Sequence, residues 1–229
     1  MPPTAAPAPP GRPNYYNDED FVRPDPARGT LRDAAGRRLV CASADLLAAL
    51  TAAVEAENGA TAGDVFYDLG RRWGEADFRA FADRAPREFG VPSLEQMHFN
   101  VMLESWRWPL TAAGWGTWRY DFRRARAGLP VVELANSAVV AAVGRTGKPA
   151  CDLYAGLFAA VFSSLARREL AGVELQCAAA GADGCRILVA SSAKAAAAAK
   201  LRDEGLSAEE ILDRLVPPPA AEPGKEPGA

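Results

Sequence analysis

The 229-residue sequence has few cysteines, no excess of basic residues and no long apolar segment. Its net charge is −3, and its Lys and Arg residues are mixed with acidic residues, so no basic stripe indicates nucleic-acid binding. The longest apolar run, residues 155–162, is far shorter than the roughly 20 residues that a membrane span needs. The N-terminus also lacks the basic and apolar regions of a secretory signal, so we expect a cytoplasmic protein.

The four cysteines are better suited to metal binding or to free thiols than to disulfides, because the protein looks cytosolic. One dense group of basic residues stands out, and we expect it to be the solvated face or the exit of a strand. It consists of Arg119, Arg123, Arg124 and Arg126. No partner that is a nucleic acid follows from it.

Composition divides the chain into three parts. Residues 1–28 are rich in Pro and Ala and predict an unstructured leader. Residues 29–192 contain the regular patterns and are long enough for one buried core. Residues 193–229 predict two short helices followed by a disordered, Pro-rich tail.

Apolar spacing predicts an α+β fold, an antiparallel sheet packed with helices. A hairpin is expected over residues 30–42, and Pro86 and Pro109 are expected to lie at or beyond the ends of two helices. Capping boxes are expected at Thr61 with Asp64, Ser93 with Gln96 and Ser207 with Glu210. The expected helices cover residues 43–57, 61–85, 94–106, 151–170, 193–203 and 207–215. The expected strands cover residues 115–124, 131–137, 173–178 and 185–190.

Three of the four cysteines fall in one segment together with a glutamate, in the pattern C-x22-E-x2-C-x7-C. The four residues are Cys151, Glu174, Cys177 and Cys185. Cys177 and Cys185 flank a hairpin turn, and Cys151 begins a helix, so the side chains can meet. Glu174 and Cys177 would point to opposite faces of a regular strand, and this spacing therefore predicts a twist or bulge between them.

Thiolates favour zinc, and four protein ligands make a closed, structural site that leaves no position for water. The alternative is that these cysteines are small buried apolar residues, which free cysteines often are. Spacing alone leaves both interpretations open.

The same segment resembles the C-terminal signature of the 4-vinyl reductase domain. The resemblance rests on residues 149–156 (PACDLYAG), 173–177 (VELQC), Gly181 and 184–186 (GCR). Residues 63–74 (GDVFYDLGRRWG) and Asn136-Ser137 also fit the pattern, so the resemblance extends over about residues 30–190.

This family is similar in fold to Bet3-type subunits of vesicle tethering complexes, so the resemblance implies an α+β domain, a homodimer and an apolar ligand cavity. In bacterial activators that sense phenols, the domain binds zinc through a Cys, a Glu and two further Cys. The resemblance therefore implies structural Zn2+ bound by Cys151, Glu174, Cys177 and Cys185. Cys41 lies outside the pattern and is expected to be a buried strand residue.

The resemblance also implies a ligand pocket, because the phenol-sensing relatives hold the ligand hydroxyl with a His and a Trp. His98 is the single histidine, and either Trp106 or Trp108 could be the Trp. The predicted ligand-binding residues are His98, Trp106, Trp108, Tyr120, Tyr154 and Phe158. The alternative is that His98 is a core or interface residue and that the aromatic residues serve packing.

We therefore predict a zinc-containing, sensor-type domain that binds a hydrophobic or aromatic small molecule and passes its output to a protein partner. One alternative is an enzyme or accessory protein of tetrapyrrole metabolism related to 4-vinyl reductase. The sequence has no dinucleotide-binding fingerprint, and a closed zinc site cannot activate water, so we expect a binding protein rather than an enzyme. The other alternative is a Bet3-like assembly or scaffold protein.

Overall fold

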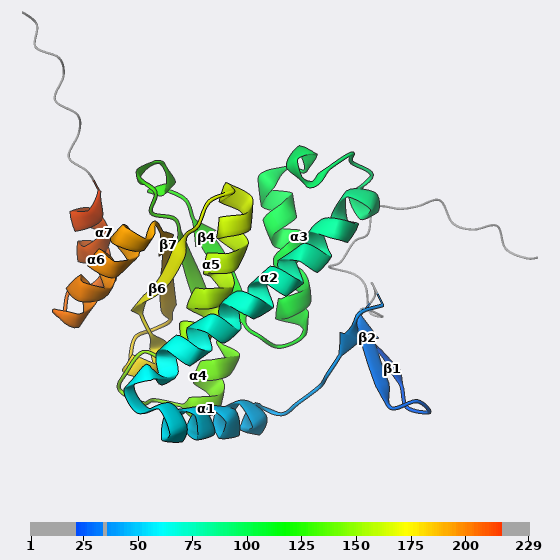
Figure 1. Ribbon diagram of the computed structural model, residues 1–229, viewed down its shortest axis with the longest axis horizontal. Helices are drawn as coiled ribbons and strands as arrows, with labels where there is room; N and C mark the ends of the chain where they lie inside the picture. The colour runs from blue at the N-terminus through cyan, green and yellow to red at the C-terminus, as the bar shows by residue number, and fades with distance from the viewer. Residues whose placement is uncertain (1–21, 34–35, 217–229) are drawn as a thin grey trace, which may run out of the picture.

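The computed structural model describes residues 22–33 and 36–216, which form two antiparallel sheets and a set of helices (Figure 1). The predicted α+β class is confirmed. Residues 1–21, 34–35 and 217–229, with most of the predicted leader and the Pro-rich tail, lie outside the described residues. Residues 22–25, which the sequence assigned to the leader, form the first strand. No helix in the described ranges has the length and apolar character to cross a membrane.

The smaller sheet contains β1 (Val22–Asp25), β2 (Thr30–Asp33) and β3 (Arg38–Leu39) in that order. β2 and β3 form the predicted hairpin, in which Gly36 has a φ of 82°. Arg37 follows this turn and donates to Asp77 on α2 at 2.6 Å, and Asp77 accepts from Trp106 Nε1 at 3.0 Å. The buried Asp77 carboxylate thus joins the small sheet to the core.

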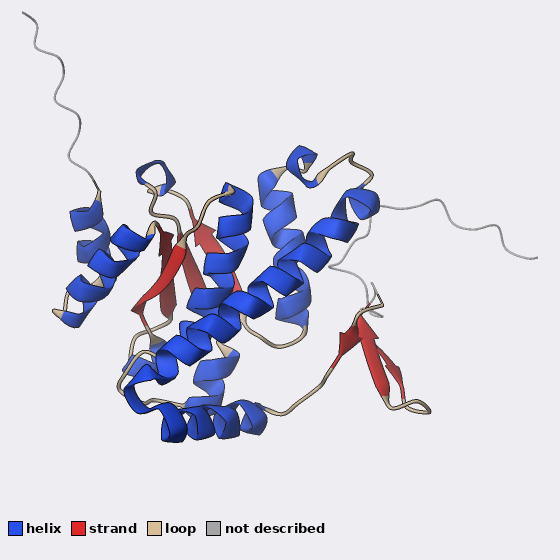
Figure 2. Cartoon of the chain, viewed as in Figure 1, coloured by secondary structure: helices blue, strands red, loops and turns tan. Residues whose placement is uncertain are grey.

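The larger sheet has the order β4-β5-β7-β6 and separates two groups of helices (Figure 2). Its strands are β4 (Thr117–Asp121), β5 (Val131–Ala135), β6 (Ala171–Gln176) and β7 (Cys185–Ala190). One face packs against α2 (Ala62–Phe89), α3 (Phe99–Ala112) and α5 (Asp152–Ala166). The other face packs against α6 (Ser192–Asp203) and α7 (Ala208–Leu215). Helices α1 (Ala44–Asn58) and α4 (Ala138–Val143) lie together at one end of the molecule.

Glycine residues bring α2 and α5 into close contact. A Cβ added to Gly70 would lie 1.9 Å from the carbonyl oxygen of Leu153, and one added to Gly156 would lie 2.0 Å from the carbonyl oxygen of Tyr67. These distances are far below van der Waals contact, so only glycine fits at either position. The close approach lets α5 pass through the core, where every residue from 153 to 162 is buried.

Both internal prolines lie inside helices, so the predicted helix ends at these positions were wrong. α2 continues past Pro86 to Phe89, which packs against the core, and Gly90 ends the helix with a φ of 64°. α3 begins at Phe99 and continues past Pro109, because the next residue, Leu110, is buried. Packing of apolar residues in the last turn outweighs the hydrogen bond that each proline removes.

Capping follows the prediction at one of the three sites. The capping box of Ser207 and Glu210 is present at the start of α7. Thr61 and Ser93 precede their helices without a side-chain cap hydrogen bond, and Leu94–Gln96 is a separate 3-10 helix before α3. Three further 3-10 helices cover Gly59–Thr61, Ala125–Ala127 and Ala178–Ala180.

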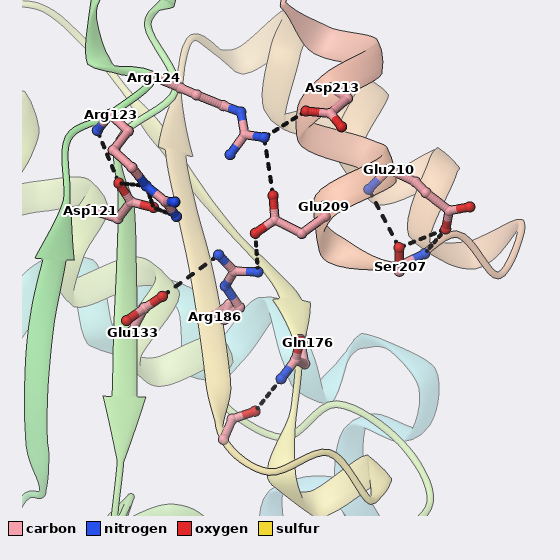
Figure 3. Close-up of polar contacts among 11 residues, drawn as sticks. Asp121, Arg123, Arg124, Glu133, Gln176, Arg186, Ser207, Glu209, Glu210 and Asp213 are labelled. Atoms are coloured by element: carbon pink, nitrogen blue, oxygen red, sulfur yellow. Dashed lines mark hydrogen bonds and ion pairs between the residues drawn. The ribbon is translucent and has the colours of Figure 1, made fainter.

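A charge network holds α7 over the outer face of the sheet (Figure 3). Glu209 lies between Arg124, at 3.0 Å, and Arg186 on β7, at 2.8 Å. Arg124 also pairs with Asp213, and Arg186 with Glu133. Beneath these charges, Ile211 and Leu212 are fully buried against the sheet. The predicted exit of a charged strand is therefore a docking site for the C-terminal helix.

Replacing Glu209 by Gln is expected to lower the free energy of unfolding by about 1 kcal/mol or less, because its side chain is half exposed. The hydrogen bond from Arg186 lowers the pKa of Glu209 in the folded protein. The stabilisation is therefore present above the unfolded-state pKa and is lost as pH falls through the folded-state pKa. The urea midpoints of variant and wild type should differ at about pH 7 and converge near about pH 3. A Glu57→Gln variant on the exposed face of α1 is the control, and an equal difference at both pH values would contradict this prediction.

Candidate metal centre and ligand groove

Four residues from two elements and their ends form a buried cluster beneath the start of α5. Cys151 precedes α5, Glu174 lies on β6, Cys177 follows β6 and Cys185 begins β7. One ligand atom from each residue lies within 4.8 Å of the others, and all four residues are buried. The structure therefore brings together every residue of the predicted metal set.

A bulge allows Glu174 and Cys177 to face the same site. The register between β6 and β7 shifts between Glu174 and Gln176. Without this shift, two residues three positions apart would point to opposite faces of the sheet. The irregularity predicted from the E-x2-C spacing is confirmed.

The sulfur spacing fits a tetrahedral metal ion. Cys151 Sγ lies 3.5 Å from Cys185 Sγ, which lies 3.9 Å from Cys177 Sγ. A zinc–sulfur bond of about 2.3 Å gives a tetrahedral edge of about 3.8 Å. A disulfide would need about 2.05 Å, and all three thiols are free.

Glu174 completes the cluster with one engaged and one unengaged oxygen. Its Oε2 accepts a hydrogen bond from the backbone N–H of Cys151 at 3.0 Å. Its Oε1 is buried and has no hydrogen-bond partner among the described residues. A buried carboxylate oxygen without a partner is costly, and a metal ion bound by the three sulfurs would satisfy it.

The cluster is electrostatically crowded. Burial raises the pKa of Glu174 to about 8, and the neighbouring Cys177 adds to this. Hydrogen bonds from Cys151 and Cys185 lower the pKa of Cys177, whereas the same contacts and burial raise the pKa of Cys151. The cluster cannot carry four negative charges alone, so a divalent cation would bind here in exchange for protons.

The surrounding groups support these four ligands. Ser137, which caps α4, places its Oγ 3.6 Å from Cys151 Sγ, and the N–H of Ala178 donates to Cys185 Sγ at 3.4 Å. Arg202 on α6 donates to the backbone oxygen of Glu174 at 2.9 Å. Cys151, Glu174, Cys177 and Cys185 are thus positioned to hold a metal ion with four protein ligands.

Three of the predicted ligand-binding residues pack together in the core. Trp106, Tyr154 and Phe158 are fully buried around Trp118, whose ring centroid lies 6.0 Å from that of Trp106 and 5.4 Å from that of Phe158. Tyr154 donates to the backbone oxygen of Trp115. These contacts are those of a packed core, and none of the three residues lines either groove described below.

The other three predicted residues are separate from this cluster. His98 is exposed and precedes α3, and Trp108 is half-buried on α3. Tyr120 on β4 accepts from Trp118 Nε1 at 3.0 Å and stacks on Phe122. Contact with a ligand stays a prediction for all six residues.

A large groove lies beside the metal cluster, between α1, α2 and α4. Its volume is about 770 Å3, and residues 149, 150, 152 and 153, which flank Cys151, form part of its floor. Most of its large side chains are aliphatic or aromatic, including Leu47, Leu50, Phe66, Leu69, Trp73 and Trp115. Polar side chains gather at one end, namely Glu55, Thr146, Lys148, Asp152 and Arg202.

A second groove of about 460 Å3 lies at the far end of α5, where Phe99, Phe122 and Phe162 meet. The sequence missed both grooves. α4 was not predicted, because a run of alternating Ala and Val after Ser137 has no clear helical spacing. The available signal was the apolar face of residues 43–57, which is too exposed to belong to the core, since α1 has no buried residue.

Comparison with known proteins agrees with this geometry. Residues 130–190 match the family model of the 4-vinyl reductase domain, so the resemblance to that family is confirmed there. No curated protein matches the chain. The chain is similar to the crystal structure of the phenol-responsive sensory domain of the transcription activator PoxR with phenol, at 20% identity and a TM-score of 0.58. The match covers 89% of this chain and 96% of that chain, and it shows a shared fold.

Proposed function

From the family match, the shared fold and the groove beside the metal cluster, we propose that this protein is a zinc-containing, sensor-type domain that binds a hydrophobic or aromatic small molecule. The groove is the observation that carries the proposal. Its volume of about 770 Å3 and its mainly apolar wall are typical of small-molecule sites. The PoxR domain is described as phenol-responsive, which supports a binding role for this fold.

Zinc is the metal that the donor set favours. Three thiolates and one carboxylate exclude magnesium and calcium, which prefer oxygen ligands alone, and the sulfur spacing suits tetrahedral coordination. With four protein ligands the ion has no open position, so its role is to join α5 to the hairpin of β6 and β7. Because Cys151 lies between groove residues Ala150 and Asp152, the ion would also fix the floor of the groove.

The Ala142→Trp variant is expected to weaken ligand binding at least about tenfold, because Ala142 lines the groove and the indole would fill it. Binding is measured by thermal shift and tryptophan fluorescence with a panel of alkylphenols, fatty acids and tetrapyrroles. The matched control is Ala141→Trp, since Ala141 is exposed on the same helix and does not line the groove. Failure of every compound to bind the wild type, or equal effects of both variants, would contradict the proposal.

A homodimer and a protein partner for output also remain proposals. Leu46 and Leu50 on α1, together with Val65 and Leu69 on α2, are exposed between 39% and 57%, which supports a contact surface at this end of the molecule. The same observation favours the second candidate function, a Bet3-like assembly role. Light scattering with and without ligand distinguishes the two, because only a sensor changes its association when the groove is filled.

A further inference from the structure

The groove has an aromatic end and a polar end, about 15 Å apart along α2. Gly63 and Trp73 both line it, and ten residues of helix rise by about 15 Å. Trp73 contacts Trp115 at one end, with ring centroids 4.5 Å apart. At the other end, a Cβ added to Gly63 would lie only 2.9 Å from Asp152 Oδ2. The absence of a side chain at Gly63 therefore leaves the Asp152 carboxylate open to the groove.

Asp152 is the charged group at the polar end that has unused hydrogen-bonding capacity. Lys148 Nζ pairs with Glu55 at 2.8 Å. Arg202 donates to Asp203 and to the backbone oxygen of Glu174. Within the described ranges, no side chain donates a hydrogen bond to Asp152 or forms an ion pair with it.

On the basis of the proposed function, we infer that Asp152 is the polar anchor of the ligand. The ligand is then an elongated apolar molecule whose one end carries a hydroxyl or amine donor. A half-buried carboxylate without a donor is costly, and a ligand O–H or N–H would satisfy it, while the apolar part extends toward Trp73 and Trp115. The apolar flank of a second protein copy would leave this carboxylate without a donor, so the polar end favours a small molecule.

The test compares 4-hexylphenol with its methyl ether, 4-hexylanisole, which differs by loss of the donor hydrogen. The wild-type protein should bind the phenol about tenfold more tightly, as measured by calorimetry and tryptophan fluorescence. Asp152→Ala should abolish this preference, and Gly63→Val, which covers the carboxylate without removing it, should do the same. Lys148→Met is the matched control at the same end of the groove and should keep the preference. Metal content is measured for each variant, because Asp152 adjoins Cys151.

Each outcome bears on a different claim. If Asp152→Ala and Gly63→Val retain metal and still prefer the phenol tenfold, the anchor is elsewhere and the inference is overturned. The same holds if His98→Ala abolishes the preference, because the exposed histidine would then be the anchor. If neither compound binds the wild-type protein, the proposed function fails, and the inference fails with it. Equal binding of both compounds to the wild type would overturn the anchor alone.

Discussion

A Cys177→Ser variant should lose its metal. The purified wild-type protein is expected to contain about one zinc ion per chain, and the variant close to none, as measured by elemental analysis. The free energy of unfolding should fall by at least about 3 kcal/mol, since structural zinc sites contribute on the order of 10 kcal/mol in small domains. The physical reason is local: without the ion, two further thiols and the unpaired Oε1 of Glu174 stay buried together.

The fourth cysteine provides the matched control. Cys41 is exposed and lies outside the cluster, so Cys41→Ser should keep both metal and stability. Its exposure also corrects the expectation that it is a buried strand residue. A Cys177→Ser protein with full metal content and an unchanged urea midpoint would show that the site does not use these four ligands. A chelator that removes the ion from wild type should reproduce the loss of stability in the variant.

The metal cluster could be predicted from the sequence because its constraints are local. The hairpin of β6 and β7 brings Cys177 and Cys185 together, and the period of a strand shows that Glu174 needs a bulge to join them. The helix that starts at Cys151 is strongly apolar, so its existence and direction were also clear. Each of these inferences needs only a few neighbouring residues.

The groove could not be predicted because its walls come from distant parts of the chain. Leu50 on α1, Trp73 on α2 and Trp115 before β4 meet only after the core has formed. In the sequence, Trp73 and Trp115 look the same as Trp106, which is buried and hydrogen-bonded to Asp77. Aromatic residues that pack and aromatic residues that line a cavity carry the same local pattern, and the choice between them depends on tertiary contacts.

The helix ends at Pro86 and Pro109 illustrate the same limit. Proline removes one backbone hydrogen bond from a helix, and this cost is visible in the sequence. The compensating burial of Phe89 and Leu110 is not visible, because it depends on where the core lies. Local propensity was outweighed by packing at both positions.

A Gly70→Ala variant is expected to lose about 3 kcal/mol or more of its unfolding free energy. Its new methyl group would lie 1.9 Å from the carbonyl oxygen of Leu153, a backbone atom that can move only with the whole of α5. Overpacking against a side chain costs about 1–3 kcal/mol, and a clash with a helix backbone belongs at or above that range. The higher helix propensity of Ala offsets only about 1 kcal/mol.

The displacement should reach the functional site, because Leu153 lines the groove and lies two residues after Cys151. Gly70→Ala should therefore lower the urea midpoint and also weaken metal retention, measured as zinc released at a fixed chelator concentration. Arg79→Ala is the control: it lies on the exposed face of the same helix, and its midpoint should change by no more than about 0.5 kcal/mol equivalent. If Gly70→Ala kept both its midpoint and its metal, α2 and α5 would not be in the close contact on which the shape of the groove depends.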